Sequence, residues 1–150
     1  MANELSEIFK ALRTALLTDG TLTAMLGESS GIWFDEPRAD MPFPAITIDV
    51  RALNPQNRNG SFTGVWTPDL QVNLFGVDPH VLTNMMAHLE ATWDIPRNRS
   101  TVVESTNYRM TRLQMIGGGH VGAVRLLSTQ QDLRHYASEW RCRVAKKTGT

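Results

Sequence analysis

Residues 67–93, TPDLQVNLFGVDPHVLTNMMAHLEATW, decide the fold, because one hydrophobic periodicity replaces another within them. Up to Phe75 apolar and polar residues alternate, which is typical of a strand with one buried face. Asp78 and Pro79 then provide a helix cap and a first-turn proline, and the apolar residues recur at helical spacing as far as Trp93. A half-buried strand that leads directly into an amphipathic helix predicts a helix packed on one face of a sheet.

The N-terminal residues repeat the same helical spacing and predict a second main helix. A short helical continuation is expected from there to Gly27, which is a plausible C-terminal stop. Two amphipathic helices are enough to cover one face of a sheet. The apolar stripe of this first helix consists of Leu5, Ile8, Phe9, Leu12 and Leu16.

Further strands are predicted at residues 32–34, 45–51, 108–116 and 136–144, since each stretch is β-rich or alternates. We therefore predict an α+β fold, with a mostly antiparallel sheet of four to five strands and two main helices packed on one face. The whole chain, residues 1–150, is expected to form a single domain.

Two polar, glycine-containing stretches separate the predicted strands, and we expect both to be extended loops. Residues 53–64 combine asparagine, proline and glycine, which is typical of a long loop or a hairpin tip. Residues 117–132 begin with three consecutive glycines, which weaken any regular element. Residues 146–150 form a polar C-terminal tail.

The composition excludes several classes of protein. With 150 residues, 41% of them hydrophobic, the chain has globular composition, and no apolar run approaches the length of a membrane helix. A single cysteine excludes an internal disulfide. The 15 basic and 15 acidic residues cancel, so the chain lacks the net basic surface of a general nucleic-acid binder.

This zero net charge hides a division along the chain. Residues 1–96 hold 5 Lys/Arg against 12 Asp/Glu, whereas residues 97–150 hold 10 against 3. Two interpretations remain open. Strands of the basic third can pair with acidic neighbours inside one domain, or copies of the chain can meet acidic face to basic face. Twelve of the 15 basic residues are arginine, which is enriched at protein interfaces.

No catalytic, cofactor or metal site is predicted. Neither the four histidines nor the single cysteine, Cys142, has the spacing of a metal site, and Cys142 lies in an alternating strand as expected of a buried thiol. Residues 117–122 lack the Lys-Ser/Thr of a phosphate-binding loop. An assembly or binding module is therefore expected.

Three stretches carry a resemblance to a known family. The first is LRTALLTD (12–19) with LTAMLG (22–27), and the second is IWFD (32–35) followed by MPFPAITI (41–48). The third is LQVNLFG (70–76), which runs into the helix of residues 82–93. In these stretches and in the order of its elements, the chain resembles the tail terminator, or tail completion, proteins of long-tailed bacteriophages.

The resemblance implies a structural role in the virion, without enzymatic activity, cofactor or metal. Such proteins form a ring, usually of six subunits, on the head-proximal end of the tail tube. The ring ends tube polymerisation and provides the docking surface for the neck. The implied partners are further copies of the chain, the tail tube protein and the head–tail connector, with genomic DNA passing through the lumen without specific binding. The implied location is the tail–neck junction, after assembly in the host cytoplasm and without a membrane.

Two alternatives stay open: another head–tail joining component of the neck, or a small α+β enzyme or ligand-binding domain. The candidate ring or partner contacts come from the two expected loops and from the basic third of the chain. They are Arg58, Asn59, Trp66, Arg109, Arg112, His120, Arg141 and Arg143.

Overall fold

The computed structural model describes residues 5–34, 42–95, 97, 103–125 and 132–147. Its helices are α1 (Ser6–Leu17), α2 (Gly20–Thr23) and α3 (Pro79–Thr92). Its strands are β1 (Ile32–Phe34), β2 (Ala45–Ala52), β3 (Pro55–Arg58), β4 (Ser61–Trp66), β5 (Asp69–Gly76), β6 (Val103–Glu104), β7 (Tyr108–Arg125) and β8 (Asp132–Lys146).

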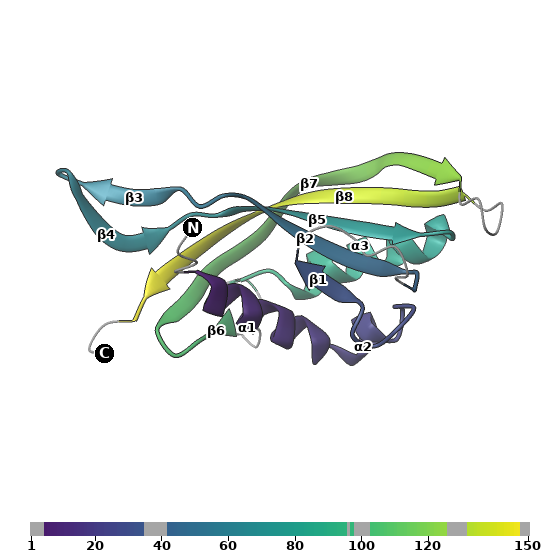
Figure 1. Ribbon diagram of the computed structural model, residues 1–150, viewed down its shortest axis with the longest axis horizontal. Helices are drawn as coiled ribbons and strands as arrows, with labels where there is room; N and C mark the ends of the chain where they lie inside the picture. Colours follow the sequence, from purple (N-terminus) through teal and green to yellow (C-terminus); the bar gives the residue numbers. More distant parts are fainter. Residues whose placement is uncertain (1–4, 35–41, 96, 98–102, 126–131, 148–150) are drawn as a thin grey trace.

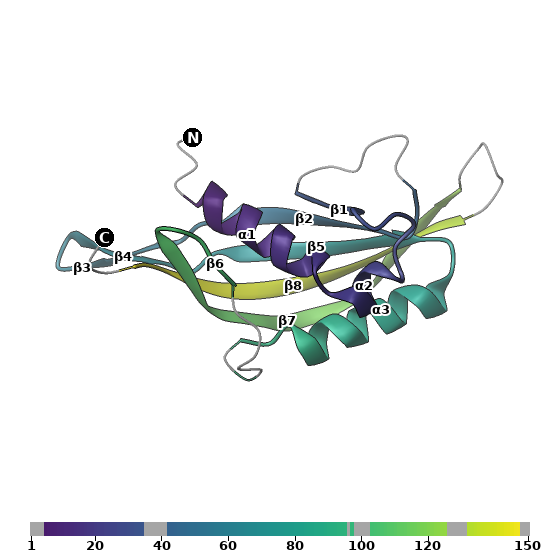
Figure 2. The same cartoon turned by 90° about the horizontal axis from the view of Figure 1, so that it is seen from below.

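The strands form one mixed sheet in which all pairs are antiparallel except β1 with β2. β8 is the central strand: β5 and then β4 pair along one of its edges, and β7 pairs along the other. β2 and β1 continue the sheet beyond β5, and the short β6 pairs with β7. All three helices lie on one side of the sheet (Figures 1 and 2). The α+β class and the helix-covered face are therefore confirmed, and the sheet is larger than the predicted four to five strands.

The core lies between the helices and the sheet. The predicted stripe of α1 is buried throughout, and so are the apolar residues of β5 and β8 on the helix-covered face, among them Leu74 and Trp140. Asp78 caps α3 as predicted, because its carboxylate accepts a hydrogen bond of 2.9 Å from the amide of His80. Burial of this apolar surface supplies most of the stabilising free energy of the fold.

Of the long loop or hairpin tip expected at residues 53–64, the structure shows the hairpin: these residues are the greater part of a β-hairpin. β3 and β4 pair with each other and project from one end of the sheet (Figure 1). Asn59 and Gly60 both have positive φ, 53° and 77°, as a type I′ turn requires. Asparagine followed by glycine between β-capable residues is the usual sequence signature of such a tight hairpin.

The expectation of a loop over residues 117–132 is wrong for its first part. β7 continues through the three glycines to Arg125, because their backbones pair with residues 137–139 of β8. Pairing with a long central strand thus outweighs the low strand propensity of glycine. Residues 126–131 and 148–150 lie outside the described part of the chain. In that part, no helix is long and apolar enough to cross a membrane.

Candidate interaction surface

The face of the sheet that carries no helix is the candidate functional surface, and we call it the open face. Side chains alternate along a strand, so the residues between the core positions of β2, β5, β7 and β8 point to this face. The register of the ladders brings them into rows: Asp49 lies opposite Gln71, which lies opposite Glu139, which lies opposite Gly117. Four strands from distant parts of the sequence thus build one surface.

A hydrogen-bonded network crosses three strands of the open face. Asn73 of β5 is 3% exposed and donates to Asp49 Oδ2 of β2 at 3.0 Å. Its Oδ1 accepts from Gln71 Nε2 and from His135 Nε2 of β8, both at 2.7 Å. Arg51 in turn donates to Gln71 Oε1. Because the network joins β2, β5 and β8, it fixes their register as well as the surface they present.

Four of the predicted contact residues gather on the open face near the hairpin. Arg112 of β7 lies directly opposite Arg143 of β8, and Arg141 and Arg109 lie on the same side of the two strands. Arg141 forms an ion pair with Asp69 at 3.8 Å. Arg112 has no hydrogen-bond or ion-pair partner among the described residues. Two arginines that face each other across a ladder repel one another, so this part of the surface suits an acidic partner.

A shallow hollow of about 390 Å³ lies further along the open face, over the glycines of β7. Gly117 and Gly119 leave its floor without side chains, and Gln71 and Glu139 line it. An adjoining hollow of about 310 Å³ shares Gln71 and Glu139 and is lined by Ile116. Ile116 and Val121 are 51% and 61% exposed. Glycines within a strand often mark a place where another backbone or a ligand approaches closely.

The hairpin carries two predicted contacts, and a third lies at its root. Arg58 and Asn59 are exposed at the tip. Trp66 is only 5% exposed, with its ring 4.5 Å from that of Phe62 and 5.6 Å from that of Tyr108. Trp66 therefore anchors the hairpin to the sheet rather than offering itself to a partner. The backbone of His120 pairs with Tyr136 in the ladder, and its side chain lies outside the described residues.

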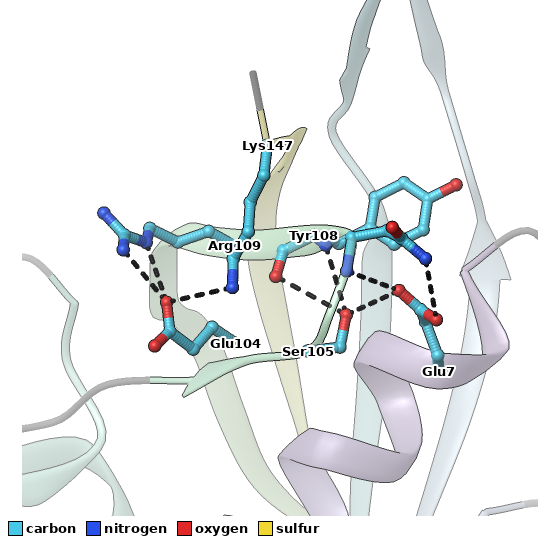
Figure 3. A network of polar contacts seen from close by, with 7 residues as sticks. Glu7, Glu104, Ser105, Tyr108, Arg109 and Lys147 are labelled. Atoms are coloured by element: carbon cyan, nitrogen blue, oxygen red, sulfur yellow. Dashed lines mark hydrogen bonds and ion pairs between the residues drawn. The ribbon is translucent and has the colours of Figure 1, made fainter. Parts of the chain in front are cut away.

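A polar cluster beside the start of α1 ties the helix to the β6–β7 turn (Figure 3). Glu7 accepts hydrogen bonds from Ser105 Oγ at 2.8 Å and from the amide of Asn107 at 3.0 Å. These bonds, the one from Ser105 above all, lower the pKa of Glu7 below its ordinary value. The cluster joins residues about 100 positions apart, so its evident role is structural.

The second half of this cluster is ionic. Glu104 accepts two hydrogen bonds from Arg109, at 3.0 and 3.1 Å, and forms an ion pair with Lys147 at 3.5 Å (Figure 3). The hydrogen bonds from Arg109 are the main reason that the pKa of Glu104 lies below its ordinary value. The charge of Arg109 is thus already compensated inside the chain, in contrast to that of Arg112.

Asp19 joins the helices to one another. Burial by itself raises its pKa, but hydrogen bonds from Trp93 Nε1 at 2.8 Å and from His88 Nε2 at 2.7 Å, together with one from the amide of Leu22, lower it below its ordinary value. Asp19 therefore caps α2 and holds α3. The sequence shows the cap, but nothing local shows the partners 69 and 74 residues away.

The described residues form no metal-binding group, and their cysteine is not exposed. Cys142 is completely buried, and this burial raises the pKa of its thiol far above the ordinary value. Within the described ranges, no three His, Cys, Asp or Glu side chains gather where they could hold a metal ion. The surface features that sequence reasoning missed are Glu139, Ile116 and the network around Asn73. The one sequence pattern that indicates this polar surface is the alternation of Gln71 and Asn73 with apolar residues in β5.

Comparison with known proteins identifies the fold. No family model matches the chain, and no curated protein sequence matches it either. A chain of a solved structure described as "Virion of native gene transfer agent (GTA) particle" superposes with a TM-score of 0.57 and 12% sequence identity. The match covers 93% of this chain and 92% of that one. The protein therefore shares its fold, over nearly its whole length, with a chain of a gene transfer agent virion.

Proposed function

We propose that the chain is a structural protein of a virion, where it acts by its shape and converts no substrate. The observation that carries the proposal is the likeness of fold to a chain of the gene transfer agent particle, which spans both chains almost completely. The resemblance of three sequence stretches to tail terminator proteins agrees with this likeness. The open face presents polar residues and arginines from several neighbouring strands, and such a surface suits a protein partner better than a small molecule.

The finer role that we propose is that of a tail terminator. Six copies form a ring on the head-proximal end of the tail tube, end its polymerisation and present a docking surface to the neck. Genomic DNA passes through the lumen without specific binding, which a chain of zero net charge favours. Its partners are then the tube protein and the head–tail connector.

The distribution of charge supports a ring. A closed ring joins two different surfaces of the same chain, so these surfaces must be complementary. The helical layer, residues 5–31 and 77–95, carries few basic residues, whereas the open face carries Arg109, Arg112, Arg141 and Arg143 of β7 and β8. In the helical layer the acidic residues are Glu7, Asp19, Glu28, Asp78, Glu90 and Asp94, and the basic ones are Lys10 and Arg13.

The decisive experiment mixes the purified chain with polymerising tube protein and follows tube length by electron microscopy. We expect tubes that stop growing and carry a ring at one end, and mass photometry of the chain alone should show a ring of six copies. Rings that bind the connector but leave tube growth unchanged would indicate another joining component of the neck instead. A chain that stays monomeric and binds neither partner would contradict the proposal altogether.

A further inference from the structure

The β3–β4 hairpin lacks support from the rest of its own chain. All side chains of residues 55–63 are exposed, and within the described part of the chain β3 pairs only with β4. β4 reaches β8 only through Val65 and Trp66, at the root. A two-stranded hairpin by itself is at best marginally stable in water. We call residues 55–63 of this hairpin the arm. Because Phe62 is 46% exposed, the arm is stabilised when it packs on another surface.

The hollow over Gly117, Gly118 and Gly119, which we call the glycine hollow, is a part of the open face without side chains above the backbone. A Cβ atom added to Gly117 or Gly119 would meet no atom within 4 Å, so nothing in the chain itself fills the space above them. Gly118 points to the other side, where Met86 Sδ would lie 3.3 Å from its Cβ. The hollow thus offers backbone and space, bordered by the exposed apolar side chains of Ile116 and Val121.

The arm and the hollow are complementary in charge. Arg58 is the one charged residue between Leu53 and Trp66. Glu139 supplies the carboxylate at the hollow, where it lines both depressions of the open face. Neither Arg58 nor Glu139 has a hydrogen-bond or ion-pair partner among the described residues. An opposite pair of this kind guides one surface onto the other and sets the register of the contact.

The arm cannot reach the hollow of its own chain. The hairpin projects from one end of the sheet, whereas β7 and β8 run on toward the other end (Figure 1). From Gly119, which pairs with Ala137, to the root at Val144, and on to the tip at Asn59, the path along the strands is roughly 48 Å at about 3.4 Å per residue. The two features can therefore meet only between copies.

We propose that the β3–β4 hairpin of one copy docks on the glycine hollow of the next copy, with Arg58 placed against Glu139. This inference rests on the proposed ring and names the contact that closes it. Because the arm and the hollow are different surfaces, the contact is head-to-tail and continues around a ring. The exposed ring of Phe62 then lies against the apolar border formed by Ile116 and Val121.

A charge exchange tests the pairing. Arg58→Glu and Glu139→Arg should each raise the protein concentration at which rings form, measured by mass photometry, by roughly tenfold or more. The double variant Arg58→Glu/Glu139→Arg should recover most of that loss. Arg97→Glu, an exposed charge reversal that lies outside the helical layer, the arm and the hollow, is the matched control and should not weaken assembly. Gly119→Val should also block docking, since its Cβ atom meets no atom of the chain within 4 Å and the side chain extends into the hollow.

Cross-linking tests the geometry directly. The double variant Ser61→Cys/Gly119→Cys places one thiol on the arm and one in the hollow, while the native Cys142 is buried and does not compete. Mild oxidation should yield a ladder of covalent oligomers ending at the ring, and either single variant should yield dimers at most. A ring of the unaltered chain that tolerates both charge reversals and gives no ladder would overturn this inference alone. A chain that never leaves the monomer would overturn the proposed ring as well.

Discussion

The two faces of the sheet differ in burial and polarity, although the same strands form both. In β8, Trp140 and Cys142 point to the helices and are buried, whereas Arg141 and Arg143, the residues that alternate with them, point to the open face and are exposed. Apolar burial on the first face stabilises the fold. On the second face, polar side chains and arginines are presented on a rigid support.

Within a single strand, the residues that stabilise the fold thus alternate with those that are available to a partner. A functional surface built on a sheet is more precise than one built on loops, because the ladder fixes the position of every second side chain. The open face is not uniform, however. Its centre around Asn73 is buried and hydrogen-bonded, and its outer parts carry Arg112 and the glycine hollow. The following changes test how far each part behaves like core or like surface.

The largest effect is expected for Trp140→Ala on the helix-covered face. Trp140 is 2% exposed, and its Nε1 donates to Ser138 Oγ at 2.8 Å. Truncation leaves a cavity in the core, so we expect a loss of about 3–5 kcal/mol in the free energy of unfolding, measured with denaturant. Its neighbour on the other face is the control: Arg141→Ala should cost less than about 1 kcal/mol. Equal losses would contradict the division of the faces.

A smaller loss is expected for Asn73→Ala at the centre of the open face. The change removes the hydrogen bonds that the Asn73 amide makes with Asp49 and His135 at a buried position, which costs about 1–3 kcal/mol. Denaturant unfolding again provides the measurement. If the variant is as stable as the unaltered chain, the network is dispensable and the centre of the open face behaves as ordinary surface.

Asp19 gives the helical layer a dependence on pH. Because its pKa is lowered in the folded chain, the stabilisation is present above the unfolded pKa and is lost as pH falls through the folded pKa. Asp19→Asn should therefore cost about 1 kcal/mol at neutral pH, through the weaker cap and the altered contacts to His88 and Trp93. Thermal melts between pH 7 and acidic pH should show a shallower decline for the variant. An unchanged slope would place the acid sensitivity elsewhere, with Glu7 and Glu104 as the other carboxylates of lowered pKa.

The smallest effect on stability is expected for Arg112→Ala. Removal of one arginine from a like-charged pair relieves repulsion with Arg143, so the free energy of unfolding should change by less than about 0.5 kcal/mol. Assembly should nevertheless weaken in mass photometry if this region contacts an acidic partner. A variant that loses stability and assembles normally would reverse the assignment of this residue from recognition to folding.

The helices and most strands could be predicted because their signals are local. The 3.6-residue period of Leu5 to Leu16 and the alternation of Leu70, Val72 and Leu74 each report one buried face, whatever that face packs on. The glycines of β7 could not be predicted in this way. Their strand conformation depends on backbone pairing with β8, about 20 residues further along the chain.

The candidate surface was predictable only in its parts. Arginine in the basic third indicated an interface, and Arg112, Arg141 and Arg143 do lie together on the open face. Trp66 is a candidate contact that the structure buries at the root of the hairpin, and the sequence around it gives no sign of which side of the strand it faces. Glu139 was overlooked, since a single carboxylate among arginines carries no local signal until Gly117 is placed opposite it.

The sequence by itself determined which residues are buried together and which are presented to the outside, because alternation and helical spacing depend on neighbours a few positions apart. The tertiary structure alone decided which strands adjoin and in what register, and hence that Asp49, Asn73 and His135 form one network while the arm and the hollow lie at opposite ends. The reason is physical: long-range pairing is selected by the packing of the whole core, and its free energy is shared among contacts that no short stretch contains.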